Sequence, residues 1–175
     1  MHAVTLGSGA HLRIRPIRPD DESRLAELYS RLSRHTAYQR FFTVMRRLPP
    51  DWFRYFANVD YVRRLALVAE RDTPHGAAVV AVARYEPADE ADTAEVAFVV
   101  EDGWQGQGLG AVLLHDLLAA ARARGIERFR AYVMADNHRM LKLLTSRVQV
   151  QERKLEEGVV SLLFTTAGAA DAAPR

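Results

Sequence analysis

The sequence predicts a single α/β domain built on a mixed, mostly antiparallel sheet of about seven strands, with helices on both faces. Two observations carry this prediction. Segments with the two-residue alternation of strands and segments with the 3.6-residue spacing of helices follow one another along the chain. The 175 residues are also enough for one hydrophobic core, and no internal repeat or linker divides them.

The first half of the chain supplies four of the predicted strands and three of the predicted helices. Residues 11–21, "HLRIRPIRPDD", alternate apolar and basic side chains at their start, which predicts a short strand that stops near Pro16 to Pro19. Asp20 and Asp21 suit a helix start, where carboxylates meet free N–H groups, and the predicted helix covers Asp21 to Arg34. Further on, the pattern predicts a short helix or turn at 36–42, a helix at 49–59, and strands at 63–71, 77–86 and 93–101.

The second half predicts a long amphipathic helix from Gly108 to Arg124, with leucines on one face. A strand at 128–134, a helix at 137–147 and a hairpin at 148–165 that turns near Glu157–Gly158 follow it. The predicted domain therefore spans residues 12–165. We expect residues 1–11 to form an N-terminal extension and the Ala-rich residues 166–175 to form a flexible tail.

Composition excludes several classes of function. The chain has no cysteine, which removes disulfides, thiolate metal sites and a cysteine nucleophile. Its net charge of +2 comes from scattered basic residues, so we expect no nucleic-acid partner. The histidines lack metal-ligand spacing, so no metal is expected. Because no apolar run reaches the roughly 20 residues that span a bilayer, and no signal-peptide core occurs at the start, we expect a soluble, cytoplasmic protein with no membrane partner.

A glycine-rich segment joins the strand at 93–101 to the long helix. Within Gln105 to Gly110, three glycines fall at a helix start, where N–H groups have no internal partner and the helix dipole is positive. Glycine also lets an anion approach the backbone without a Cβ in the way. The glycine spacing fits neither a Walker loop nor a dinucleotide fingerprint. The segment predicts a phosphate-containing ligand held by main-chain amides; the alternative is a tight turn with no ligand.

The same segment resembles a known motif. Val100 followed by Gln105-x-x-Gly108-x-Gly110 is similar to the acetyl-CoA-binding motif Q/R-x-x-G-x-G/A of the GNAT superfamily of N-acetyltransferases. The resemblance covers residues 12–164, and the phrases "YQRFF" and "LALVAE" resemble the acetyltransferase domain of bacterial Pat-type protein lysine acetyltransferases.

This resemblance implies a GNAT-like domain with acetyl-CoA as its cosubstrate. It also implies that the loop amides hold the coenzyme pyrophosphate, and that the strand at 97–100 splays from its neighbour and pairs with the pantetheine arm. The implied coenzyme-binding residues are Phe98, Val99, Val100, Gln105, Gly106, Gln107, Gly108, Leu109, Gly110, Ala111 and Asn137.

Glu95 is the candidate catalytic residue, as a general base. An alkylammonium acceptor must lose a proton before its nitrogen attacks a thioester, and apolar surroundings raise the pKa of a carboxyl toward the range this needs. Glu95 shares a strand face with Ala97 and Val99, and Pat-type domains carry a glutamate at the matching place. The alternative is a solvated glutamate paired with an arginine such as Arg84. A backbone N–H near Val99 or Val100 is expected to polarise the thioester carbonyl.

Two departures from the family pattern concern the helix at 137–147. Ser146-Arg147-Val148 stands where relatives have a Gly-Phe pair, and Leu143 or Leu144 where many have a tyrosine acid, which leaves the general acid undetermined. Asn137 predicts an N-cap for this helix, and the family implies that it also bonds the coenzyme arm.

The predicted function is transfer of an acetyl group from acetyl-CoA to a primary amine, in particular a protein lysine, by direct attack. Two alternatives stay open: a small-molecule amine or a protein N-terminus as acceptor, and a sensor module that binds acetyl-CoA without transferring it. We expect acceptor specificity to lie around Thr43 to Tyr61 and in the last hairpin. A homodimer is also left open.

Overall fold

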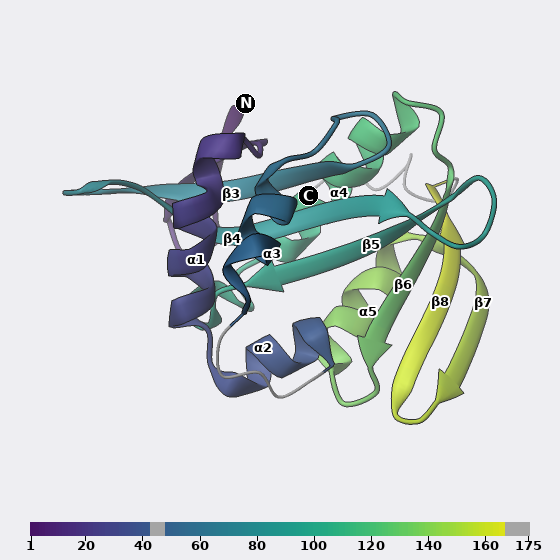
Figure 1. The fold of residues 1–175 in the computed structure, drawn as a ribbon. Coiled ribbons are helices and arrows are strands. Elements are labelled where there is room, and N and C mark those ends of the chain that lie inside the picture. Colours follow the sequence, from purple (N-terminus) through teal and green to yellow (C-terminus); the bar gives the residue numbers. More distant parts are fainter. Residues whose placement is uncertain (43–47, 167–175) are drawn as a thin grey trace.

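The protein, in a computed structural model that describes residues 1–42 and 48–166, places eight strands in one sheet with the order β1-β2-β3-β4-β5-β6-β8-β7 (Figure 1). Five α-helices of the described residues flank the sheet. The elements in chain order are β1 (His2–Thr5), β2 (His11–Pro16), α1 (Glu22–Arg31), α2 (Arg34–Phe41), α3 (Pro50–Ala57), β3 (Leu65–Thr73), β4 (Gly76–Pro87), β5 (Thr93–Val100), α4 (Leu109–Arg122), β6 (Arg128–Met134), α5 (His138–Arg147), β7 (Gln149–Glu156) and β8 (Val159–Thr165).

The sheet is mixed and mostly antiparallel, which confirms the predicted fold class. Only β5 and β6 pair in parallel, because α4 carries the chain back across the sheet between them. β8 then inserts between β6 and β7, antiparallel to both. The hairpin turn falls where it was predicted, with positive φ at Glu157 (49°) and Gly158 (79°) as a two-residue hairpin turn requires.

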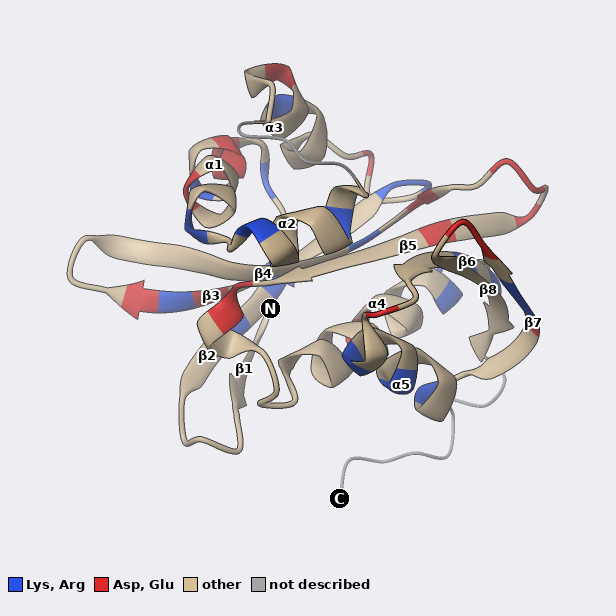
Figure 2. Cartoon of the chain, turned by 90° about the horizontal axis from the view of Figure 1, so that it is seen from below, with Lys and Arg blue, Asp and Glu red and all other residues tan. Residues whose placement is uncertain are grey.

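Helices cover both faces of the sheet, and each layer has its own core. α4 and α5 lie on one face and α1, α2 and α3 on the other (Figure 2). On the first face Leu113 and Leu117 of α4 pack with Phe129 of β6 in the larger core. On the second face Leu25 and Leu28 of α1 contribute to the smaller one. The helical spacing of these leucines placed them in the core correctly.

Two boundaries differ from the sequence prediction. β1 adds an eighth strand within the predicted extension, pairing His2–Thr5 with β2. The pattern missed it because this edge strand of four residues has no buried alternation. The first helix ends at Arg31 instead of Arg34, because the Ser33 hydroxyl accepts the Thr36 N–H at 3.1 Å and starts α2. The predicted tail, after the buried Thr166, lies outside the described residues.

A buried ion network ties β2 to the start of α1. The guanidinium of Arg15 donates to both carboxylate oxygens of Asp21 at 2.7 and 2.8 Å and to Glu70 at 2.7 Å. Asp21 is fully buried and also accepts the Arg18 N–H. Burial alone would raise the pKa of Asp21, but the hydrogen bonds from Arg15 and Arg18 outweigh it and hold the pKa below its usual value.

Among the described residues, none of the helices has the length and apolar character of a membrane span.

We predict that Asp21→Ala lowers the free energy of unfolding by about 3–5 kcal/mol at neutral pH, because it leaves a buried arginine short of its partner. Urea unfolding followed by circular dichroism measures this, and Asp20→Ala, at an exposed neighbour, is the matched control. Because the pKa of Asp21 is depressed in the fold, the wild-type advantage is present above the unfolded pKa and disappears as pH falls through the folded one. Equal losses in the two variants would contradict this role.

Candidate active site

The cavity of interest opens where β5 and β6 separate. Their ladder runs from Thr93 paired with Arg128 to Val96 paired with Ala131 and stops there. Both strands continue, β5 to Val100 and β6 to Met134, held by β4 and β8 on their outer sides. The inner backbone edges beyond Val96 and Ala131 therefore have no strand partner. This is the splay that the family resemblance implied for residues 97–100.

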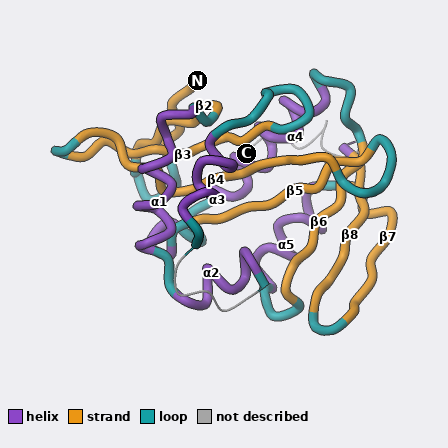
Figure 3. Tube along the Cα trace, in the orientation of Figure 1, coloured by secondary structure: helices purple, strands orange, loops and turns teal. Residues whose placement is uncertain are grey.

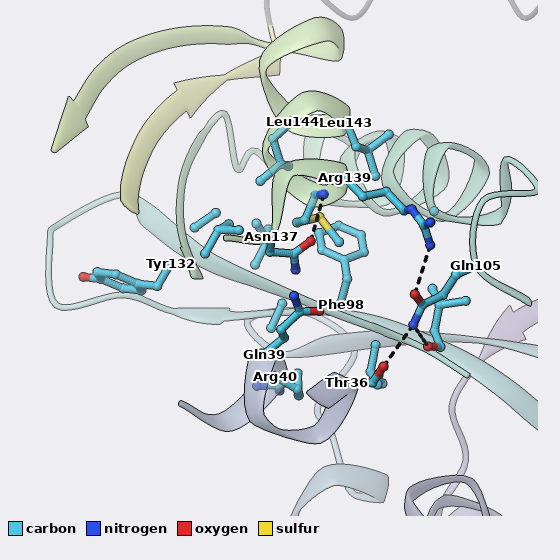
Figure 4. A pocket seen from close by; sticks show the side chains of 18 of the residues that line it. Thr36, Gln39, Arg40, Phe98, Gln105, Tyr132, Asn137, Arg139, Leu143 and Leu144 are labelled. Carbon is cyan, nitrogen blue, oxygen red and sulfur yellow. Dashed lines mark hydrogen bonds between the residues drawn. The ribbon is translucent and has the colours of Figure 1, made fainter. Parts of the chain in front are cut away.

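A cavity of about 220 Å³ lies in this opening (Figure 4). β5 lines it from Glu95 to Val100, and β6 lines it from Ala131 to Val133. Three further parts of the chain close it: the glycine loop, the first turns of α5 and the inner side of α2. Their lining residues include Thr36, Gln39, Arg40, Gln105, Gly106, Gly108, Gly110, Ala111, Asn137, Arg139, Met140, Leu143 and Leu144.

The glycine loop presents free amides to this cavity. Among the described residues, no acceptor bonds the N–H groups of residues 106–110, and α4 begins at Leu109. The Ala111 N–H already donates to the Gly108 carbonyl at 3.1 Å, so Ala111 contributes only its place in the lining. Gly108 has φ +89°, a conformation that an L side chain rarely adopts. Such a run of amides at a helix N-terminus has the geometry of an anion-binding loop.

Two other residues of the predicted loop have structural roles in their side chains. Leu109 is buried in the core, 1% exposed. The Gln107 side chain donates to the Gly103 carbonyl and accepts from Ser8, outside the cavity lining. Gly110 permits close packing, because a Cβ there would lie 3.1 Å from the Leu143 side chain of α5. The loop is therefore held by the hydrogen bonds of Gln107 to Gly103 and Ser8 and by the packing of Gly110 against α5.

Gln105 joins three parts of the cavity wall (Figure 4). Its amide nitrogen donates to the Val100 carbonyl at 2.9 Å and to the Thr36 hydroxyl at 3.2 Å, and its oxygen accepts from Arg139 at 3.0 Å. The guanidinium of Arg139 consequently lies beside Gly106. A cation is thus held next to the free amides, which sequence analysis did not anticipate.

Asn137 caps α5 as predicted. Its side-chain oxygen accepts the Met140 N–H at 3.1 Å, and its side chain lines the cavity. Leu143 and Leu144 line the cavity as well, so this part of the wall is apolar. Among the described lining residues, Tyr132 of β6 is the only tyrosine. On α5, Leu143 and Leu144 occupy the positions where many relatives have a tyrosine acid, so α5 supplies no such tyrosine.

Glu95 lies at the start of the splay with no ion pair or hydrogen bond to its carboxylate among the described residues. The expected alternative partner, Arg84, has its Nη2 2.8 Å from Glu86 instead. The β6 neighbour of Glu95 in the register is Arg130, which pairs with Glu90 and with Glu152. Arg84 and Arg130 are therefore both paired with other glutamates.

The surroundings shift the pKa of Glu95 upward. Although the side chain is exposed by surface area, the protein around it removes enough water to disfavour the charged form. The positive charge of Arg40 on α2 opposes this shift of the pKa, and the negative charges of Glu86 and Asp89 reinforce it. The expectation of a raised pKa at Glu95 is confirmed.

Sequence analysis missed the contribution of α2. Thr36, Gln39 and Arg40 line the cavity from a helix that the sequence predicted only as a short helix or turn. Their polar residue types in one helical turn were the available signal, but nothing in the sequence relates them to β5. Part of the segment expected to govern acceptor specificity, residues 43–47, lies outside the described residues.

The fold and cavity define an α/β protein with a free-amide loop between two separating strands. Residues 25–147 match the model of the Acetyltransferase (GNAT) family, and the chain belongs to that family of acetyltransferases. It is 33% identical over 142 residues to Acetyltransferase Pat of Mycolicibacterium smegmatis, covering 81% of this chain and 42% of that protein. The chain thus spans less than half of that relative's length.

Solved structures agree with this assignment. The GNAT domain of S. lividans PAT superposes with a TM-score of 0.82 at 38% identity, covering 94% of this chain and 96% of that domain. This confirms the resemblance to Pat-type domains. The acetyltransferase yncA from Salmonella typhimurium, described with its cofactor acetyl-CoA, shares the fold with a TM-score of 0.68 at 20% identity, covering 94% of this chain and 98% of that one. Acetyl-CoA is the cosubstrate of the family.

Asp102 fastens α2 to the glycine loop. Its carboxylate accepts the Ser33 N–H at 3.0 Å, the Ser33 hydroxyl at 2.6 Å and the Thr36 hydroxyl at 2.8 Å. Burial opposes its ionisation, but these donors keep the pKa of Asp102 below its usual value, so the carboxylate stays charged at neutral pH.

We predict that Asp102→Ala accelerates amide hydrogen exchange in α2 about tenfold or more, because hydrogen bonds to a charged group contribute about 1.5–3 kcal/mol. Exchange measured by mass spectrometry on peptides covering residues 34–41 tests this. Glu27→Ala, at an exposed position of α1, is the control. Unchanged exchange in α2 would show that Asp102 does not hold the helix.

Proposed function

We propose that this chain transfers an acetyl group from acetyl-CoA to a protein lysine side chain, with Glu95 as the general base. The observation that carries the proposal is a carboxylate that has a raised pKa and no partner among residues 1–42 and 48–166, in the same cavity as the free-amide loop. Such a carboxylate is available to accept a proton, and the loop amides beyond the other end of β5 are available to hold a phosphate-bearing donor.

The coenzyme fits the cavity by its chemistry. The N–H groups of residues 106–110 would hold the pyrophosphate, with Arg139 as the adjacent cation. The open backbone edge from Phe98 to Val100 would pair with the amide-containing pantetheine arm. Asn137 keeps its side-chain amide nitrogen available after capping with its oxygen, which suits a second bond to that arm.

The reaction then needs two protons removed from the acceptor nitrogen, one before it attacks and one as the amide forms. Glu95 takes the first from the ammonium group, directly or through water, and the freed nitrogen attacks the thioester carbonyl. A backbone N–H near Val99 or Val100 would stabilise the negative charge that develops on the carbonyl oxygen. As the C–S bond breaks, the coenzyme leaves as a thiolate and takes up the second proton of the nitrogen through water, so no enzyme acid is required.

A protein lysine is the favoured acceptor because of the similarity to Pat-type domains over nearly the whole length of the S. lividans domain. A different acceptor and a non-catalytic sensor would each give a different result in a thiol-release assay. A small amine or a protein N-terminus would replace lysine peptides as the best acceptor in a thiol-release assay. A sensor would bind acetyl-CoA and release no thiol with any amine.

We predict that Glu95→Gln lowers kcat about 10²–10⁴-fold with little change in acetyl-CoA affinity, because the amide cannot accept the proton. Thiol release on a lysine peptide and calorimetry with acetyl-CoA measure the two quantities. Wild-type kcat/KM should rise with pH through the raised pKa of Glu95, above the usual glutamate range, since only the ionised form is a base. The variant should lack that inflection.

Retained turnover in Glu95→Gln would remove Glu95 from the mechanism while leaving the fold and the coenzyme site untouched. Glu86→Gln is a useful companion because Glu86 lies directly opposite Glu95 on β4. It tests whether the inflection belongs to Glu95 itself or to the pair of carboxyl groups.

We also predict that Gly108→Ala weakens acetyl-CoA binding about tenfold, because a Cβ strains a residue at φ +89° and turns the loop amides away. Gly103→Ala is the matched control in the same loop, since Gly103 has no positive φ and open space around the added Cβ. Calorimetry with acetyl-CoA distinguishes them. Equal affinities of the two variants would mean that the coenzyme does not depend on the loop conformation.

A further inference from the structure

No helix of residues 1–42 and 48–166 lies over one face of the β6–β8–β7 half of the sheet. α4 and α5 lie on the other face of the sheet, whereas α1, α2 and α3 lie over its remaining part (Figures 1 and 2). The β4–β5 loop and the β7–β8 turn lie at opposite ends of the three strands (Figure 3). The bare face is therefore bounded at both ends by loops.

A groove runs over this face and joins the active-site cavity. Arg130, Tyr132 and Met134 of β6 and Ser161 of β8 line it, and α2 contributes Tyr38 and the adjoining Phe42. Tyr132 and Phe42 line both the groove and the cavity that contains Glu95. Three of its aromatic side chains are exposed: Tyr38 by 36%, Phe42 by 38% and Tyr132 by 45%. Exposed aromatic side chains grouped on one surface are typical of a contact region for a partner.

The charge of the groove is unbalanced toward negative. Its charged lining comprises the four glutamates 90, 152, 156 and 157 and two cations, Arg130 and Lys154. Arg130 pairs with Glu90 and Glu152, and Lys154 lies 3.3 Å from Glu152. Glu156 and Glu157, at the β7–β8 turn, have no ion pair among the described residues. Both free negative charges thus stand at one end of the groove.

We propose that this groove docks the acceptor protein through a segment whose target lysine is followed or preceded by further basic residues. The inference rests on the proposed function and names the acceptor's chemistry. The lysine would pass between Phe42 and Tyr132 toward Glu95, while neighbouring cations meet Glu156 and Glu157. A second copy of this chain is the poorer occupant, because a face of net negative charge repels itself in a symmetric contact.

The test uses three peptides with blocked N-termini, each with one lysine, flanked by arginine, glutamine or glutamate. Arginine is charged but offers no competing acceptor amine at neutral pH. For the wild-type protein we expect kcat/KM to fall from the arginine to the glutamine to the glutamate peptide. In the double variant Glu156→Gln/Glu157→Gln the advantage of the arginine peptide should fall about three- to tenfold, with acetyl-CoA affinity unchanged. High salt should reduce the wild-type advantage in the same way.

The matched control removes the same charge elsewhere. Glu27→Gln/Glu127→Gln changes two exposed glutamates that line neither the cavity nor the groove, and it should keep the wild-type preference. An unchanged preference in Glu156→Gln/Glu157→Gln would overturn the proposed docking. A dimer that dissociates in this variant, seen by sedimentation, would also overturn it and assign the face to a second copy.

Binding of the same peptides, measured by fluorescence anisotropy, separates this proposal from the proposed function. If the arginine peptide binds the wild-type groove, loses affinity in the double variant and is never acetylated, the docking surface stands and the lysine transferase fails. If all three peptides are acetylated equally, the transferase stands and the docking surface fails.

Discussion

The end of the β5–β6 ladder at Val96 and Ala131 is the constraint on which the rest of the site depends. Beyond this point β5 stays bonded to β4, and β6 stays bonded to β8, so neither strand can turn inward to close the gap. Backbone groups left without a partner are costly unless water or a ligand satisfies them. The opening is thus a rigid slot with hydrogen-bonding edges, placed directly before the N-terminus of α4.

Strand register also decides which carboxylate remains available. Of the arginines around Glu95, Arg84 pairs with Glu86 and Arg130 pairs with Glu90 and Glu152, whereas Arg40 of α2 acts on Glu95 through its charge. Loss of water around the carboxyl group therefore raises the pKa of Glu95, although the positive charge of Arg40 opposes the shift. Arg130 also lines the groove, where its two glutamate partners neutralise its charge, while Glu156 and Glu157 have no ion pair among the described residues.

α2 links the two halves of the site. Through Asp102 and Thr36 it is fixed to the loop that precedes α4, and through Phe42 it borders the groove on the bare face. Gln105 extends this connection to α5 by accepting from Arg139. These contacts involve residues next to the free amides, so the position of the loop depends on the position of α2 and α5 in the cavity wall. A rigid first layer supported by a second set of hydrogen bonds is what a precise site requires.

The sequence by itself determined the elements whose signal is local. Hydrophobic spacing located the core helices, Gln105–Gly110 marked the loop, and Asn137 marked a cap, because each depends on neighbours only a few residues away. Only the tertiary structure decided what depends on contacts between distant segments. The placement of α2 against β5, Arg139 beside Gly106, and the separate partners of the arginines near Glu95 all join residues far apart in the chain. The short edge strand β1 also belongs to this second group, because its pairing with β2 defines it and it has no buried face that the sequence could reveal.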